Sequence, residues 1–191
     1  MVHYSIFDVI RNSFSFLYTK LYYPRARLIR WPLFTSGARF IYGNGLTLGR
    51  GCRIDVGDRS DALKIGSNAR IGDYVHINAD KKVHIGDNVL MASKIFISDA
   101  NHGSYSGDCQ SLPNTNPSQR ELFFEPVVIG DNVWIGENVV ILPGTTIGNG
   151  CVIGANSLLR GKNYPDNTIV AGTPARVIKK FNVNTCRWEK I

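Results

Sequence analysis

Aliphatic residues recur at every sixth position over much of this 191-residue chain. The recurring positions are Ile65, Ile71 and Ile77, then Ile85, Met91 and Ile97, then Ile129, Ile135, Ile141, Ile147, Ile153 and Leu159, with Ala171 and Val177 on the same phase further on. An α-helix repeats its apolar residues every three or four positions and a half-buried strand alternates them, so neither fits. Six residues suffice for one short strand and one turn. The period therefore predicts a coil of repeated strand–turn units.

A compact residue stands two positions before these aliphatic residues. The compact residues are Ala69, Val75, Val83, Val89, Val127, Val133, Val139, Thr145, Cys151, Ser157 and Ala175. Residues two apart on a strand point to the same side, so both positions should fill the interior. Glycine often follows the aliphatic residue, and Asp-Asn or Ser-Asn pairs come next. We assign these residues to corners, where positive φ is tolerated. Three units would close one triangular coil, and stacked coils would pair as parallel strands.

Two steps in the series are longer than six residues. Eight residues separate Ile77 from Ile85, and thirty-two separate Ile97 from Ile129. The excess residues must loop out of the prism. An insertion as long as the second is unusual in a packed repeat and is often functional.

The stretch that begins at residue 129 reads IGDNVWIGENVVILPGTTIGNGCVIGANS and is followed by AGTPARVIKK. These blocks resemble the hexapeptide-repeat acyltransferases, in particular galactoside and maltose O-acetyltransferases and lipopolysaccharide O-antigen O-acetyltransferases. The resemblance covers roughly residues 40 to 180. It implies an all-β fold, a left-handed parallel β-helix with a protruding loop and a short N-terminal helical appendage.

The expected organisation has three parts. Residues 1–38 form a helical and basic-aromatic cap, residues 39–180 form the β-helix with its loop at 103–125, and residues 181–191 form a C-terminal tail. The resemblance also implies a homotrimer, in which the groove between two prisms forms each active site.

The resemblance implies an acetyl-CoA-dependent O-acetyltransferase acting on a sugar hydroxyl of a lipopolysaccharide, O-antigen or other surface-polysaccharide precursor. An alcohol attacks only as its proton is removed, and histidine has a suitable pKa for this near neutrality. In the family a histidine at the start of the long loop is the base, and His102 occupies the matching position. The alternative is a loop histidine exposed by chance. His76 and His84 each precede an aliphatic anchor, so alternation points them outward.

Three polar residues are candidates for acceptor binding. Asp99 and Asn101 either orient His102, contact the sugar or serve as turn residues, and the sequence leaves these alternatives open. Asn78 resembles a family position that contacts the sugar.

Acetyl-CoA carries several phosphates and a long pantetheine arm, so its site needs an extended groove with amide donors and a few cations. By resemblance, Trp134 lines the groove near the thioester and Ala155 contacts the arm. The resemblance also places Arg176 and Lys179 at the phosphates, and Lys162 takes the place of a family lysine although one residue is inserted nearby. Trp134 directly precedes an anchor, so it should project outside the prism.

Several residues have structural interpretations. Cys52 and Cys151 fall on compact interior positions and are expected to pack rather than react, and Asp87 belongs to a corner motif that recurs at Asp131. With no Ser-His-Asp or Cys-His set, direct transfer in a ternary complex is expected. No metal is expected, because the H-x-x-x-x-H pair typical of the related γ-type carbonic anhydrases does not occur.

Two other functions stay open. An N-acetyltransferase for amino nucleotide-sugars shares the fold, although such enzymes usually carry a different N-terminal domain. A non-catalytic β-helix scaffold would leave His102, the loop and Trp134 without a role.

The N-terminal segment has Ile6, Ile10, Phe14, Leu17 and Leu21 at helical spacing, and Pro24 should end the helix. The net charge of +7 suggests an anionic partner. No nucleic acid is expected, because RNA- and DNA-binding motifs are missing. Cations beside aromatic residues suit a membrane interface, so residues 1–31 either contact the inner face of the plasma membrane or only cap the prism. A cytoplasmic location is expected, because Asp8 and Arg11 interrupt the apolar stretch that a signal peptide would need.

Overall fold

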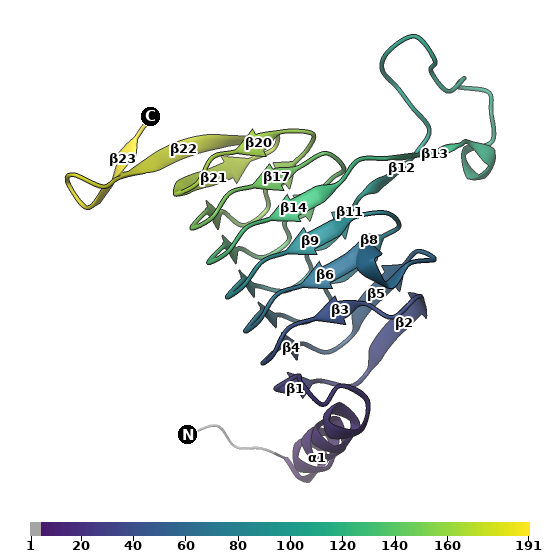
Figure 1. The fold of residues 1–191 in the computed structure, drawn as a ribbon, viewed down its shortest axis with the longest axis vertical. Helices are drawn as coiled ribbons and strands as arrows, with labels where there is room; N and C mark the ends of the chain where they lie inside the picture. Colours follow the sequence, from purple (N-terminus) through teal and green to yellow (C-terminus); the bar gives the residue numbers. More distant parts are fainter. Residues whose placement is uncertain (1–4) are drawn as a thin grey trace.

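The computed structural model describes residues 5–191 as a solenoid of stacked coils, with a helix at its N-terminal end and a long protruding loop (Figure 1). Three sheets of parallel strands, named A, B and C here, form the sides of the prism. Each coil contributes one short strand to each sheet, as the six-residue period predicts. The predicted fold class is confirmed.

The elements follow one another from α1 (Ile6–Tyr22) to β23 (Arg187–Lys190). Sheet A contains β1 (Leu28–Ile29), β4 (Thr47–Leu48), β7 (Arg70–Ile71), β10 (Leu90–Met91), β15 (Trp134–Ile135), β18 (Val152–Ile153), β21 (Thr168–Gly172), β22 (Ala175–Asn182) and β23. Sheet B contains β2 (Leu33–Gly37), β5 (Cys52–Val56), β8 (His76–Ala79), β11 (Phe96–Ser98), β16 (Val140–Ile141) and β19 (Leu158–Leu159). Sheet C contains β3 (Ile41–Tyr42), β6 (Leu63–Ile65), β9 (Val83–Ile85), β14 (Val127–Ile129), β17 (Thr146–Ile147) and β20 (Asn163–Tyr164). The remaining elements are β12 (Ala100–His102), β13 (Leu122–Phe124) and the short 3-10 helices η1 (Ser60–Ala62) and η2 (Pro117–Gln119).

The core is a set of side-chain columns that run through the stack. In sheet A, Ile71 pairs with Met91, Met91 with Ile135, and Ile135 with Ile153. Every aliphatic residue of the three unbroken series is buried, and so is every compact residue two positions before it. Since burying one such side chain contributes about 1.5–3 kcal/mol, the columns stabilise the prism along its whole length.

The repeat shifts its phase by one residue at the last coil. Tyr164 is buried five positions after the buried Leu159, and Val170 is buried six positions after Tyr164. Ala171 and Val177 are only partly buried, so the prediction that they continue the interior series is wrong. Val177 instead lies on β22, which runs antiparallel to β21.

Glycine and asparagine have different roles at the corners. The left-handed residue is the asparagine, as at Asn132 with φ 57°, and not the glycine after the anchor. A Cβ on Gly86 would lie 2.3 Å from Oδ1 of Asp131, so glycine is needed there for the close approach of the next coil. Asp87 accepts a 2.6 Å hydrogen bond from the backbone N–H of Ser67 in the preceding coil, which confirms its corner role.

The boundaries of the solenoid differ from the predicted ones at both ends. Because β1 and β2 pair with β4 and β5, the first coil begins at Leu28 and not at residue 39. At the other end, β22 and β23 extend sheet A as antiparallel strands, so residues 181–191 are part of a hairpin and not a separate tail. The protruding loop stands on a stem formed by β12 and β13 (Figure 1).

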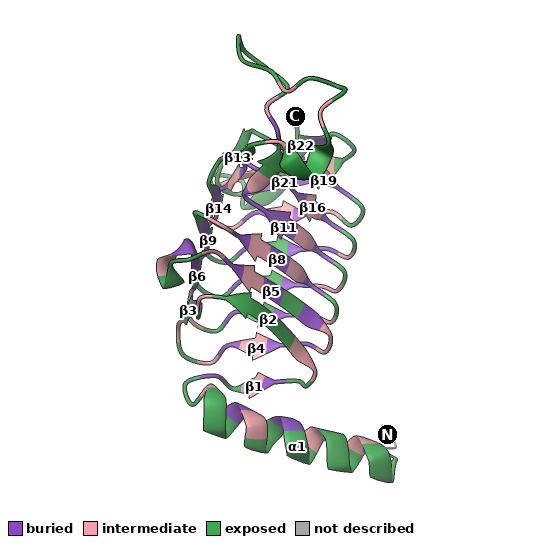
Figure 2. Ribbon diagram, turned by 90° about the vertical axis from the view of Figure 1, so that its right-hand side faces the viewer, coloured by how far each residue is buried: buried purple, intermediate pink, exposed green. Residues whose placement is uncertain are grey.

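The predicted N-terminal helix is present as α1, which lies across the end of the stack beside β1 (Figure 2). It begins with a capping box. Hydrogen bonds join it to the first coil: Thr19 Oγ1 accepts one from the N–H of Ile29 at 2.8 Å, and Ser15 Oγ accepts one from the N–H of Trp31 at 3.1 Å. These hydroxyls satisfy amides at the open edge of the solenoid, so α1 caps it.

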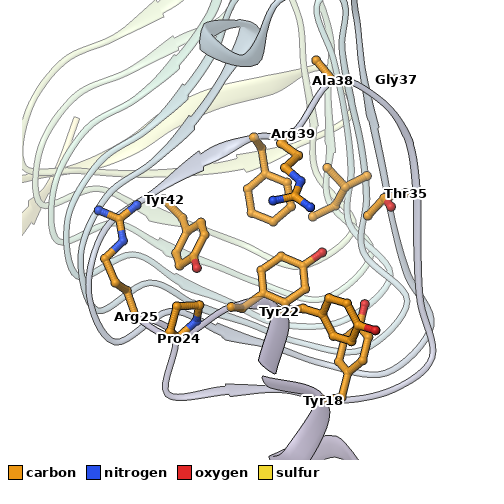
Figure 3. Close-up of a pocket in the computed structure, with 12 residues that line it drawn as sticks. Tyr18, Tyr22, Pro24, Arg25, Thr35, Gly37, Ala38, Arg39 and Tyr42 are labelled. Atoms are coloured by element: carbon orange, nitrogen blue, oxygen red, sulfur yellow. The ribbon is translucent and has the colours of Figure 1, made fainter. Parts of the chain in front are cut away.

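A half-open cavity of about 370 Å³ lies between α1 and the first coils (Figure 3). Its lining is aromatic and basic, and includes Tyr18, Tyr22, Tyr23, Arg25, Arg39, Phe40 and Tyr42. The Arg25 guanidinium lies 5.0 Å from the centre of the Tyr42 ring, within the range of a cation–π interaction.

Candidate active site

The stem of the protruding loop presents the candidate base at one edge of the prism. The chain leaves sheet B at the end of β11 and enters sheet C at β14, so the loop emerges at the edge between these sheets, the B–C edge. Within the stem, Asn101 pairs with Phe123 and His102 with Leu122. Antiparallel pairing therefore fixes the backbone on which both candidate side chains stand.

Asp99 fixes the root of this stem. Its side chain is fully buried, and its carboxylate accepts three backbone hydrogen bonds, from Asp80 at 2.9 Å, Lys81 at 2.8 Å and Lys82 at 2.6 Å. Its own carbonyl oxygen accepts a bond from the N–H of Glu125 on the returning strand. The carboxylate is thus directed at the turn of the preceding coil and has no exposed surface for a sugar.

The side chain of His102 is exposed on the stem. Within residues 5–191, no group hydrogen-bonds to its imidazole, while its carbonyl oxygen accepts a bond from the hydroxyl of Tyr105. Arg120 holds that hydroxyl at 2.7 Å and also donates to the carbonyl of Thr115 at 3.0 Å. The loop is therefore folded around Arg120, and the imidazole is left available to a substrate.

Asn101 borders a shallow cavity of about 410 Å³ on the B–C edge. Its lining comprises Asn101, Glu125, Leu142, Pro143, Arg160 and Gly161. The sequence analysis selected Lys162 from the segment around Gly161, but in this cavity the cation beside Asn101 is Arg160. Both residues follow an interior anchor at the same corner, and their order in the sequence does not tell which one faces the loop. Arg160 and Glu125 are therefore additional candidate residues.

Asn78 lies at the end of β8, one coil before Asn101. Its side-chain amide donates to Asp80 at 2.9 Å and to the hydroxyl of Ser98 at 3.4 Å. It is partly exposed, next to the root of the loop. The structure thus places Asn78, Asp99, Asn101 and His102 along one edge, together with Lys162 between β19 and β20.

The other candidate residues for acetyl-CoA form a separate group around sheet A. Trp134 on β15 is 52% exposed and projects outward, as predicted. Ala155 lies exposed at the turn between β18 and β19, where the chain passes from sheet A to sheet B, the A–B edge. Arg176 is exposed and Lys179 partly exposed on β22, and among the described residues no carboxylate pairs with either. This group offers free cations and an aromatic face, but it is not at the edge that carries His102.

One subunit therefore brings its candidate residues together in two groups and not in one site. Sheet B separates the A–B edge from the B–C edge. The candidate base and the candidate thioester surface therefore lie on different parts of the prism.

Neither interior cysteine is a nucleophile. Burial raises the pKa of the Cys52 thiol to about 11, and Cys151 is also buried, with its sulfur directed at the carbonyl of Pro165. Over residues 5–191, no cluster of histidine, cysteine, aspartate or glutamate side chains has the geometry to hold a metal ion.

Comparison with known proteins agrees with this architecture. The family model described as bacterial transferase hexapeptide (six repeats) matches residues 126–161. A putative lipopolysaccharide biosynthesis O-acetyltransferase of Escherichia coli K12 is 45% identical over 189 residues, which cover 98% of this chain and 95% of that protein. A galactoside O-acetyltransferase of the same organism is 41% identical over 61% of this chain, and the match spans 56% of that enzyme.

Two solved structures have the same fold. An N-acyltransferase from Bacillus cereus, in complex with dTDP and 3-hydroxybutyryl-CoA, superimposes with a TM-score of 0.68 over 84% of each chain, at 22% identity. A hexapeptide-repeat acetyltransferase from Vibrio cholerae, complexed with acetyl-CoA, is 30% identical, with a TM-score of 0.52 over 78% of this chain and 71% of that one.

The repeated coils and these similarities define an acyltransferase of the β-helix class. The chain belongs to the hexapeptide-repeat transferase family, and within it the protein is an acetyltransferase.

Proposed function

We propose that this enzyme transfers an acetyl group from acetyl-CoA to a sugar hydroxyl, with His102 as general base. The observation that carries the proposal is the exposed imidazole of His102, free of hydrogen bonds on a stem that Asp99 holds rigidly. An imidazole that is held in place but has no hydrogen-bond partner can accept the proton of an acceptor hydroxyl as that hydroxyl attacks the thioester.

The proposed reaction is a direct transfer. As the acceptor oxygen bonds to the thioester carbon, its proton passes to His102, and the C–S bond breaks to release the CoA thiolate. His102 can then return the proton to that thiolate, so the enzyme ends in its starting state. Cys52 and Cys151 are buried, so neither is proposed to form an acyl-enzyme.

Five residues are proposed to bind acetyl-CoA: Trp134, Ala155, Lys162, Arg176 and Lys179. The similarity to the acetyl-CoA complex from Vibrio cholerae supports this donor. Exposed cations without carboxylate partners suit the nucleotide phosphates, and the half-exposed indole can cover the pantetheine arm.

The proposed assembly is a homotrimer with its sites between subunits. The support is the separation of the two groups of residues on different edges of one prism. Side-by-side packing would bring the B–C edge of one subunit to the group around sheet A of another.

The proposed acceptor is a carbohydrate of a lipopolysaccharide, O-antigen or other surface polysaccharide, bound with the help of Asn78, Asn101 and Arg160. The relative from E. coli that matches nearly the whole chain supports this class. We place the reaction in the cytoplasm, with residues 1–31 at the inner face of the plasma membrane. The alternative acceptor is an amino nucleotide-sugar, which an N-acyltransferase would modify.

The decisive experiment follows labelled acetyl from acetyl-CoA onto a panel of free sugars, amino nucleotide-sugars and polyprenyl-linked glycans. An ester, cleaved by mild alkali, identifies O-acetyl transfer. An alkali-stable amide on an amino sugar would overturn the proposed acceptor class and establish the alternative.

The role of His102 is tested with His102→Ala, using His84→Ala as a matched control on the face of sheet C. We expect turnover to fall about 10²–10⁴-fold in the first variant, the usual contribution of a general base. Binding of acetyl-CoA, measured by calorimetry, should stay close to normal because the base makes no contact with the nucleotide. Normal turnover of His102→Ala would show that the base lies elsewhere.

A further inference from the structure

Helix α1 is oriented with its apolar side away from the protein. Its buried residues are the polar Ser15 and Thr19, which bond to the first coil. Its large apolar side chains are exposed, among them Ile6, Phe7, Ile10, Phe14, Leu17 and Leu21, with exposed fractions from 49% to 79%. A helix that only capped the coil would bury this stripe, so the stripe requires another partner.

The same end of the molecule carries its entire net charge. Residues 1–54 contain eight lysines and arginines against one aspartate, a net charge of +7, whereas residues 55–191 contain fourteen of each sign. Within residues 5–54, Lys20, Arg25, Arg27, Arg30 and Arg39 pair with no carboxylate. The partner of the apolar stripe must therefore tolerate, or attract, concentrated positive charge.

The position of α1 determines which partner can reach the stripe. The helix lies across the end of the stack (Figure 2), and the bonds from Ser15 and Thr19 direct its opposite side away from the coils. Subunits packed side by side would touch through the sides of the prism and leave this end free. End-to-end pairing of two copies would bring together two surfaces that each carry +7, which is unfavourable.

We infer that α1 is an interfacial helix that docks the enzyme on an anionic lipid surface, with its apolar stripe inserted and the coils standing away from the membrane. A helix of 17 residues is about 25 Å long, and no helix within residues 5–191 is long and apolar enough to span a bilayer. Such a helix binds by burying apolar side chains below the headgroups while nearby cations attract anionic lipid.

Other groups around α1 suit the headgroup layer. Trp31 is 46% exposed and packs edge-on against Phe14, which places an indole beside the inserted stripe. Arg25 and Arg39 line the aromatic cavity next to the end of the helix, as Figure 3 shows. This docking deepens the membrane-side location proposed above and does not depend on the acetyl transfer.

The test is flotation with vesicles of phosphatidylcholine alone, or with phosphatidylglycerol added. The apolar variant carries Ile10→Gln, Leu17→Gln and Leu21→Gln, which change exposed stripe residues but spare Ser15 and Thr19. The charge variant carries Arg25→Gln, Arg27→Gln and Arg30→Gln. A matched control removes three cations from the opposite end, with Lys180→Gln, Arg187→Gln and Lys190→Gln.

We expect the parent protein to float with anionic vesicles, much less with neutral ones, and less as salt rises. The charge variant should bind on the order of 100-fold more weakly, given roughly fivefold per cation at an anionic surface for the three cations removed. The apolar variant should lose at least about tenfold in binding, and the control variant should bind like the parent.

Several outcomes would overturn the inference. They are a parent protein that does not float, an apolar variant that floats normally, and an apolar variant whose subunit assembly is lost in sedimentation. The last result would show that the stripe lies between copies of the chain. Acetyl transfer to a small glycoside is measured on the parent protein and on all variants, which keeps this test separate from the proposed function. If none of these proteins transfers acetyl, the result contradicts the proposed reaction and not the docking.

Discussion

At the scale of single residues, Asp99 decides how the loop is attached. An aspartate at this place could touch a sugar, orient the base or make a turn, and the structure favours attachment because the carboxylate meets three backbone amides while fully buried. We expect Asp99→Asn to lower the free energy of unfolding by about 1–3 kcal/mol, since the new amide group cannot accept all three bonds. Urea denaturation measures this change.

The kinetic consequence separates attachment from substrate binding. A loosened stem should lower turnover by misplacing His102, while the KM for the acceptor changes little. Asp108→Asn, an exposed aspartate of the same loop, is the control and should change neither quantity. A raised acceptor KM with unchanged stability would instead identify Asp99 as a sugar ligand.

Which residues point inward could be predicted for the three unbroken series, because the six-residue period fixes that direction, but not for the last coil, where the phase shifts by one residue. The partners of Asp99 could not, since its acceptor oxygens meet amides seventeen to nineteen positions away, in the preceding coil. The same holds for Gly86, whose need for glycine comes from Asp131 in the next coil and not from its own φ. Contacts between coils depend on the length of every loop between them, and the loop lengths vary in this chain.

At the scale of elements, α1 shows that helical spacing predicts a helix without telling where its apolar side faces. The structure shows that the side chains of Ser15 and Thr19 face the first coil, while most of the large apolar side chains are exposed. The first coil was also placed too late, because its strands β1 and β2 lack the anchor–glycine signature.

The hydroxyl contact leads to a prediction about α1. We expect Thr19→Val to lower the free energy of unfolding by about 1–3 kcal/mol, because it leaves the buried N–H of Ile29 without an acceptor. Hydrogen exchange should speed up at the Ile29 amide, while Ser13→Ala on the exposed side of the helix should leave it unchanged. Full protection at Ile29 in Thr19→Val would show that the helix is held by other contacts.

At the scale of the whole molecule, the two groups of candidate residues lie on different parts of the prism, and the proposed trimer rests on this separation. The repeat predicts the prism, and the family resemblance supplies the trimer, but the residues alone do not show which edges meet. The proposed trimer pairs the B–C edge with sheet A because His102 stands on that edge and Trp134 on that sheet.

Subunit mixing tests this arrangement. His102→Ala and Trp134→Ala should each have little activity as pure proteins, the first without its base and the second with a damaged thioester site. Suppose that each site takes His102 from one subunit and Trp134 from its neighbour. A mixed trimer then has an intact site wherever a Trp134→Ala chain, which keeps His102, lies beside a His102→Ala chain, which keeps Trp134. Random 1:1 trimers would then recover about one quarter of the normal activity, because half of the chains carry an intact His102 and, independently, half of their neighbours carry an intact Trp134.

The two variants are unfolded together, refolded and assayed against separately refolded samples combined afterwards. Recovery in the co-refolded sample alone is expected, whereas activity no higher than the average of the two pure variants would place both residues in a site within one subunit.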